Sequence, residues 1–272
     1  MPSPNSITAP QLSRLIGTPS APAVLDVCLD ECFKAEPRLI VSSYRVPLDR
    51  LEEITSRLIG KKVVVLCQDG QAVSQGIAAK LRVRGVLAET LEGGKAAWMA
   101  AGELTVPADK IPGASNGDVS LWVTRQRPKI DRIACPWLIR RFVDPRADFL
   151  FVPPTNVLDV ADQFGAHPFD VEDVFWSHRG SLCTFDVMLH EFTLKSGPLM
   201  RVADVVRAAD TNRHELAPQA AGLLALSLGL SRMFRDDLEQ LEAGMLLYDA
   251  LYRWARDAVD EGHDWPSATI RA

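Results

Sequence analysis

The chain has 272 residues, which is room for about two domains of ordinary size. Apolar residues make up 47% and charged residues 24%, so wholesale disorder, collagen and coiled coil are excluded. A net charge of −5 argues against a general nucleic-acid binder, and no apolar run approaches the ~18 residues that a membrane helix needs. The first residues read Met-Pro-Ser-Pro-Asn, without the basic start and apolar stretch of a signal peptide. Five cysteines, an odd and sparse set, favour reduced thiols and therefore a cytoplasmic protein.

The first hundred residues alternate between strand and helix signals. Short apolar runs predict strands at 23–27, 62–66 and 86–91, and helical spacing predicts helices at 51–58, 72–83 and 93–101. Strands that alternate with short helices indicate an α/β domain with a parallel sheet flanked by helices, over residues 1–105.

A segment rich in Pro, Gly, Ser and Asn follows at 106–118 and is typical of a linker. After it, strands are predicted at 121–124 and 149–152, and helices at 136–143, 201–209, 217–228 and 236–258. Residues 119–272 are therefore expected to form a mainly α-helical α+β domain.

Cys67 stands where the predicted strand at 62–66 ends and a short glycine-containing loop leads into the next helix. This geometry directs backbone N–H groups and the positive end of a helix at the sulfur, which favours a thiolate or persulfide anion. A cysteine at a strand end is also common as a small buried hydrophobe, so the pattern alone leaves both interpretations open.

The pieces around Cys67 resemble the rhodanese-like domain over roughly residues 5–105. They are, in order, Leu25-Asp26-Val27, Val46-Pro47-Leu48-Asp49, Cys67-x-x-Gly70, Leu91-Glu92-Gly93-Gly94 with Trp98, and Ala101-Gly102. The resemblance implies a small parallel sheet and, in active members, a cysteine that carries sulfur as a persulfide. Active loops often have an Arg where this chain has Ala72, and the Gly and His of a common second motif are absent from 38–44. Whether Cys67 is the catalytic residue of a sulfurtransferase stays open at this point.

A basic cluster marks the start of the second half. Residues 125–146 hold seven Arg and Lys against two Asp, in a chain that is acidic overall. Such a cluster can hold a small anion, and it can equally be a solvated strip. If Pro136 occupies the first helical position, Cys135 becomes the N-cap and feels the helix dipole. The candidate oxyanion-binding residues are therefore Arg125, Lys129, Arg132 and Cys135.

A second group of residues has side chains that ligate transition metals. His178, Cys183 and Asp186 lie within nine residues of one another, and Asp204 follows on the next predicted helix. We predict a divalent metal site formed by these four residues, with Asp131 and Asp210 in supporting roles. The spacing matches no standard zinc motif, and Asp204 is also placed for an ion pair with Arg207 three residues later.

Three long strings, 129–142, 183–186 and 210–224, resemble the C-terminal domain of the ChrB chromate-resistance family over roughly residues 119–262. This resemblance implies a role in bacterial tolerance of chromate, through detoxification or through sensing for an efflux system. Members often begin with a basic region thought to regulate transcription, and here a rhodanese-like segment stands in its place.

Two hypotheses of different classes follow. In the first, the protein handles a small oxyanion such as chromate, together with a metal ion, and Cys67 carries sulfur from a thiol or sulfur donor; the activity would be sulfur transfer or metal-dependent oxyanion reduction. In the second, it is a non-catalytic sensor or adaptor for an efflux system. No nucleotide cofactor motif is recognised, and neither nucleic acid nor a membrane is expected as a partner. The helices at 217–258 have apolar faces and could form a homodimer seam, whereas the leucine-rich run at 223–230 within them is expected to be core.

Overall fold

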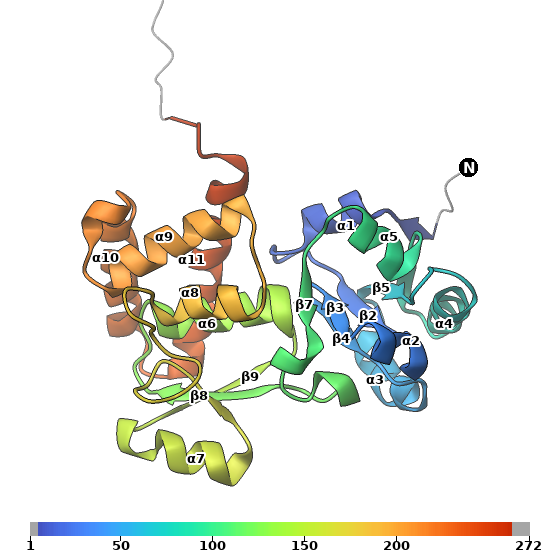
Figure 1. The fold of residues 1–272 in the computed structure, drawn as a ribbon, viewed down its shortest axis with the longest axis horizontal. Coiled ribbons are helices and arrows are strands. Elements are labelled where there is room, and N and C mark those ends of the chain that lie inside the picture. Colours follow the sequence, from blue (N-terminus) through green and yellow to red (C-terminus); the bar gives the residue numbers. More distant parts are fainter. Residues whose placement is uncertain (1–4, 263–272) are drawn as a thin grey trace, which may run out of the picture.

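The first domain is built on a five-stranded sheet in the order β1-β6-β5-β2-β4, in which all neighbouring strands are parallel. The computed structural model describes residues 5–262. Residues 1–4, which belong to the start in which no signal peptide is recognised, and residues 263–272 of the predicted second domain lie outside this range. Figure 1 shows this domain in blue and green tones beside the second domain, which runs to red. Its elements are β1 (Ser6–Ile7), α1 (Ala9–Leu15), β2 (Ala23–Asp26), α2 (Asp30–Ala35), β3 (Arg38–Ile40), β4 (Ser43–Arg45), α3 (Leu51–Leu58), β5 (Lys62–Leu66), α4 (Ala72–Val83), β6 (Leu87–Leu91), α5 (Gly94–Ala100) and β7 (Thr105–Pro107).

The central strand β5 has the residue pattern that is typical of a parallel sheet. Val63, Val64 and Val65 follow one another and are all buried, because helices pack around the sheet and cover both faces of the strand. A run without polar alternation is the sequence mark of such a strand. The predicted parallel α/β fold of this half is therefore confirmed.

The segment at 106–118 is folded rather than a bare tether. Its first residues belong to β7, which pairs antiparallel with β3, and two short 3₁₀ turns follow at Ala108–Lys110 and Ala114–Asn116. Val106, Ala108, Ile111 and Ala114 are buried. The segment therefore joins the two domains as packed chain, since these small and branched apolar residues belong to the main hydrophobic core.

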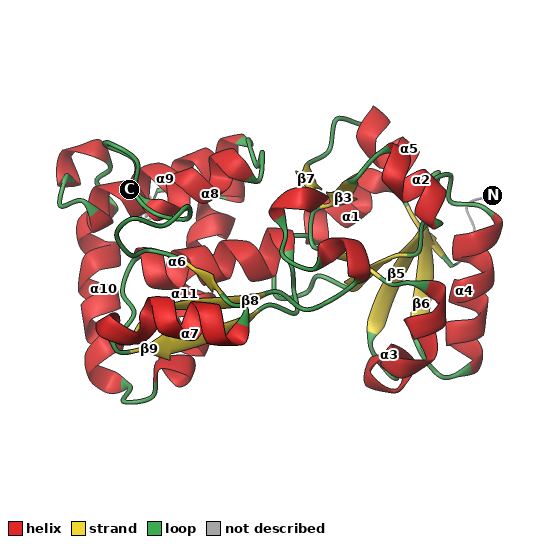
Figure 2. Ribbon diagram, turned by 60° about the horizontal axis from the view of Figure 1, so that its bottom comes forward, coloured by secondary structure: helices red, strands yellow, loops and turns green. Residues whose placement is uncertain are grey.

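The second domain has a three-stranded parallel sheet, in the order β10-β8-β9, and a larger helical part (Figure 2). Its elements are β8 (Leu121–Arg125), α6 (Asp131–Leu138), β9 (Asp148–Val152), α7 (Val157–Phe164), β10 (His167–Pro168), α8 (Thr184–Glu191), α9 (Gly197–Asp210), α10 (Ala220–Met233) and α11 (Asp237–Asp257). A helix able to cross a bilayer does not occur within residues 5–262.

Helix α6 begins earlier than the sequence predicts. Its N-cap is Ile130, at a positive φ of 42°, so Pro136 lies inside the helix and Cys135 is not a cap. The carbonyl of Ile130 accepts a hydrogen bond from the Tyr248 hydroxyl of α11 (3.0 Å). This tertiary contact holds a start that local propensity does not favour, and a π-helical turn at Ile139–Val143 ends the segment.

Helix α10 presents leucines to solvent and serines to the core. Leu223 is buried, but Leu226 is 56% and Leu228 45% exposed, whereas Ser227 and Ser231 are buried. The expectation that the whole leucine run is core is therefore wrong. Ser231 is inside because its carbonyl and hydroxyl accept hydrogen bonds from Arg127.

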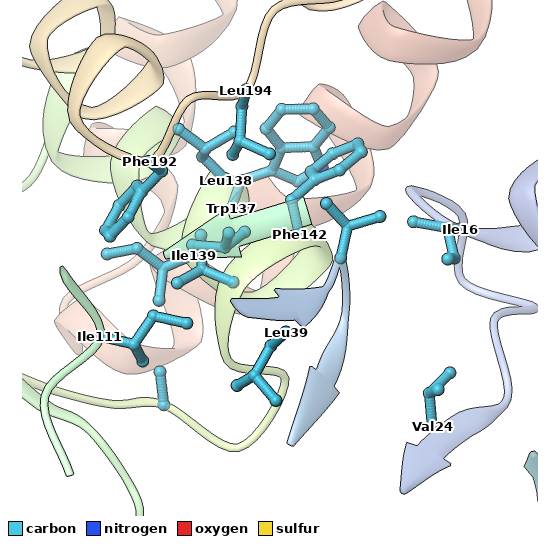
Figure 3. Close-up of a cluster of buried hydrophobic side chains, with 14 of the residues drawn as sticks. Ile16, Val24, Leu39, Ile111, Trp137, Leu138, Ile139, Phe142, Phe192 and Leu194 are labelled. Atoms are coloured by element: carbon cyan, nitrogen blue, oxygen red, sulfur yellow. The ribbon is translucent and has the colours of Figure 1, made fainter. Parts of the chain in front are cut away.

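The two domains share one hydrophobic core. Figure 3 shows Ile16 and Leu39 of the first domain near Trp137 and Phe142 of the second, and these residues belong to a single buried cluster. The backbone N–H of Ser42 also donates to the carbonyl of Phe142 (2.9 Å). Because apolar contact and a backbone hydrogen bond cross the junction, the domains form one packed unit.

A substitution at Gly17 tests how tightly the two domains pack at their junction. It has a φ of +76°, and an added Cβ would lie 2.6 Å from Phe142 Cζ and 2.6 Å from Tyr252 Cε1. We expect Gly17→Ala to lower the free energy of unfolding by about 2–3 kcal/mol, because it adds overpacking to backbone strain. Gly60→Ala is the control: its φ is +73° but nothing lies within 4 Å, so the loss should be about 1 kcal/mol. Urea denaturation measures both, and equal losses would show that the junction is loosely packed.

Candidate functional site

Three carboxylates surround one imidazole in the second domain. His178 Nε2 lies 3.6 Å from an oxygen of Asp131, 3.4 Å from one of Asp170 and 3.2 Å from one of Asp210. Asp131 opens α6, Asp170 follows β10, and Asp210 closes α9. We call these four residues the acidic pocket; one atom each from Asp131, Asp170 and His178 lie within 4.8 Å of one another, as a metal ion requires.

Asp131 is held by the N-terminus of α8. One of its oxygens accepts hydrogen bonds from the backbone N–H groups of Thr184 (2.6 Å) and Phe185 (3.3 Å), where the helix dipole favours a negative charge. The side chain is fully buried, and its other oxygen, Oδ1, has no hydrogen-bond partner among the described residues. A buried carboxylate oxygen without a partner is costly, and a cation beside it would remove that cost.

The pocket concentrates negative charge. Burial, and then the neighbouring Asp210 and Asp170 carboxylates, raise the pKa of Asp131 well above its usual range. Hydrogen bonds to Asp170 and then Asp210 raise the pKa of His178 to about 10. Protonated His178 therefore offsets part of the negative charge of these carboxylates.

Two arginines border the pocket through Asp170. Arg125 Nη2 lies 3.2 Å and Arg132 Nε 3.3 Å from the same Asp170 oxygen. Arg132 also donates to the carbonyls of Arg125 and Gln126, which fixes its orientation. Lys129 is half-buried and makes no ion pair with these carboxylates within the described part of the chain.

The two cysteines of this region are buried thiols. Cys135 is fully buried inside α6, and burial, followed by Asp131, raises its pKa well above the usual range. Burial and then Asp131 likewise raise the pKa of Cys183, whose Sγ lies 3.3 Å from an Asp186 oxygen. The expected thiolate at Cys135 is not favoured here, because no solvent or cation stabilises the charge.

The predicted metal ligands do not converge as a set. His178 lies in the acidic pocket, but Asp186 pairs with Arg207 (2.6 Å) and Asp204 pairs with the same guanidinium. The supporting candidates Asp131 and Asp210 are in the pocket instead. Asp170 was not singled out from the sequence; its signal is a carboxylate two residues after β10, at the edge where parallel strands end.

Cys67 lies at the carboxyl end of β5, as the sequence predicts. Its Sγ is within hydrogen-bond distance of Asp69 Oδ1 (3.3 Å) and Ser74 Oγ (3.2 Å), and the residue is buried. The following loop packs against α5, since a Cβ at Gly94 would lie 2.3 Å from the Cys67 carbonyl. Hydrogen bonds from Gln71 N–H and then Cys67 lower the pKa of Asp69, so a carboxylate stands beside the sulfur.

Residues 122–255 match the family model described as ChrB, C-terminal domain. Protein ChrB of Cupriavidus metallidurans is 36% identical over 133 residues, a match that covers 48% of this chain and 39% of the relative. The chain thus matches less than half of that relative's length. The resemblance predicted for the second half is confirmed.

Several solved structures that resemble the first domain are described as rhodanese-related proteins or sulfurtransferases. A rhodanese-related protein of Thermoplasma volcanium is 27% identical (TM-score 0.31) and covers 38% of this chain and 97% of its own. A thiosulfate sulfurtransferase of Pseudomonas aeruginosa is 24% identical (TM-score 0.33), covering 40% of this chain and 20% of its own. The fold class of this domain rests on its own strand order, not on these scores.

The burial of the cysteines predicts their reactivity. Under native conditions at mildly alkaline pH, iodoacetamide should modify exposed Cys32 and leave Cys135 and Cys183 unmodified, because alkylation needs an accessible thiolate. Peptide mass spectrometry measures this, and the same reaction in urea should modify all three. Native modification of Cys135 as fast as Cys32 would contradict the buried, neutral thiol.

Proposed function

We propose that the domain at 122–255, which matches the ChrB C-terminal family model, binds a divalent metal ion in the acidic pocket and an oxyanion such as chromate beside it. The single observation that carries this proposal is the approach of His178 to Asp131, Asp170 and Asp210. The protein would thereby contribute to bacterial tolerance of chromate.

The donor set fits a metal ion. Carboxylate oxygens with one imidazole suit first-row divalent ions such as Mn²⁺, Fe²⁺ or Zn²⁺. The unpartnered Asp131 Oδ1 and the close approach of several carboxylates both disfavour the pocket without a cation. Asp131, Asp170, His178 and Asp210 are thus the residues that would hold the ion.

The same pocket favours an anion once a metal is present. Three carboxylates alone would repel chromate, and a divalent ion together with Arg125 and Arg132 reverses that balance. When bound, the metal would supply a Lewis acid for an oxyanion oxygen. The half-exposed Arg125 would contribute planar, charge-assisted donors, and the more buried Arg132 would add positive charge beside Asp170.

Binding without turnover is favoured over reduction at this site. The nearest thiols, Cys135 and Cys183, are buried and neutral, so neither is an accessible electron donor. This observation supports a sensor or adaptor role for the second domain.

Metal titration tests the pocket directly. We expect one divalent ion per chain by metal analysis and calorimetry, and Asp131→Asn and His178→Gln should each weaken binding by roughly tenfold or more. The control is His190→Gln, an exposed histidine of α8 beside Glu191 that lies outside the pocket. A chain purified without chelator that is metal-free and takes up no added Mn²⁺, Fe²⁺ or Zn²⁺ would contradict the proposal.

A second function, sulfur carriage at Cys67, is supported by the strand-loop-helix setting of that residue. Cys67 directly follows β5, and a short loop leads from it to the start of α4, a setting in which backbone N–H groups can stabilise an anionic persulfide. The Asp69 carboxylate near Sγ opposes the same charge, and Ala72 supplies no cation. We therefore propose slow sulfur transfer rather than efficient catalysis.

A thiosulfate:cyanide assay tests this function. Cys67→Ser should abolish the activity, and Asp69→Asn should raise it severalfold, because the change removes a negative charge beside the sulfur. Cys32→Ser, at an exposed cysteine, is the control and should leave the rate unchanged. Activity that survives Cys67→Ser, or that falls in Asp69→Asn, would refute the assignment.

A further inference from the structure

A basic cleft of about 750 Å³ lies where the two domains meet. Six cationic residues line it, against one carboxylate, Asp148; the cations are Arg57, Lys61, Lys62, Arg140, Arg141 and Arg146. This is unexpected in a chain of net charge −5. The size is that of an ordinary small-molecule site.

The cleft is separate from both sites described above. Lys61 and Lys62 stand at the amino end of β5, whereas Cys67 follows its carboxyl end. Arg140 and Arg141 belong to the π-helical turn that follows α6, whereas Asp131 begins that helix. A ligand in the cleft would therefore touch neither the sulfur nor the acidic pocket.

One wall holds its guanidinium groups in fixed orientations. Arg141 makes two parallel bonds to the buried Asp249 (2.8 and 2.9 Å), and Arg146 contacts Asp144 (3.3 Å) and lies 4.0 Å above the Tyr44 ring. Arg140 is bound to Glu242 (2.6 Å). Arg140 also donates to the carbonyl of Ala147 (3.1 Å), and Arg146 donates to the carbonyls of Gly117 and Asp118 (both 3.0 Å). Each guanidinium has five N–H donors, so two or three on each are left for a ligand.

The opposite wall carries charge that the protein does not neutralise. Arg57, Lys61 and Lys62 are exposed and form no ion pair with any carboxylate among residues 5–262. In contrast, Lys80 of α4 and Arg84, the C-cap of that helix, both contact the Glu52 carboxylate. Pre-organised donors therefore face unpaired cations across the cleft.

The π-helical turn is an independent indication. Ile139–Val143 contains both Arg140 and Arg141, and single π turns are found frequently at functional sites. The turn shifts the helical register at the point where those side chains enter the cleft.

We propose that this interdomain cleft binds a small polyanion of the phosphate class, carrying two or more phosphate groups. Arginine forks and lysines recognise phosphate oxygens, and a ligand that touches both walls needs more than one anionic group. A small molecule is favoured over a nucleic acid because the cleft has a bounded volume and the acidic surface repels a long phosphate backbone. The ligand would join the two domains.

Calorimetry of the full chain in EDTA, with inorganic triphosphate and with ADP, tests the proposal. Lys61→Gln/Lys62→Gln should raise Kd about tenfold or more, since two charge-assisted contacts are lost. The matched control, Lys80→Gln/Arg84→Gln, removes the same charge from the same domain outside the cleft, and Kd should stay within about twofold. All four side chains are exposed, and thermal melting checks that the variants are folded.

Equal affinity for triphosphate and ADP supports recognition of the phosphate chain alone, and tighter binding of ADP supports an organic phosphate ester. Failure of both probes to bind at low salt would overturn the proposal. Equal weakening in the two double variants would also overturn it, because the effect would then be general charge. Duplex DNA bound in place of both probes, and lost in Lys61→Gln/Lys62→Gln, would assign the cleft to nucleic acid instead.

Discussion

The buried carboxylate of Asp131 is the constraint on which the second domain depends. It lies at the first residue of α6 and accepts hydrogen bonds from the first two N–H groups of α8, so it ties two helix starts together. The neighbouring Ile130 takes a positive φ that Tyr248 of α11 secures. A positive φ at a branched residue is locally unfavourable, and this helix start persists because tertiary contacts hold the backbone in that conformation. Asp131, Asp170 and Asp210 then converge on the imidazole of His178.

The fold distributes the arginines of the basic cluster at 125–146 among three different locations. Arg125 and Arg132, before and within the start of α6, face the acidic pocket. Arg127 instead donates a hydrogen bond to the carbonyl of Ser231 near the end of α10. Arg140, Arg141 and Arg146 line the cleft between the domains. The net charge does not predict where anions or cations bind in this chain, because the fold places positively and negatively charged residues in separate regions.

Long-range packing explains which site residues could be predicted. Asp131 and Asp210 lie in the long strings at 129–142 and 210–224, and His178 was recognised by its residue type, close in sequence to Cys183 and Asp186. Asp186 and Asp204 were equally plausible metal ligands, yet both carboxylates pair with Arg207 of α9. Asp170 belongs to no motif, and its place in the pocket follows from β10 pairing with β8. Spacing along the chain does not encode which carboxylate a distant arginine will neutralise.

The sequence by itself determined the element types, the parallel sheet around β5 and the resemblance of each half to a known domain. Those properties depend on local periodicity and on strings of adjacent residues, which are present before folding. Tertiary structure alone decided where α6 begins, that the segment at 106–118 is packed, and that leucines of α10 face solvent. It also decided which carboxylates meet His178. The reason is that burial and pairing are settled between segments that lie tens of residues apart, where the free energy of one contact can exceed a local preference.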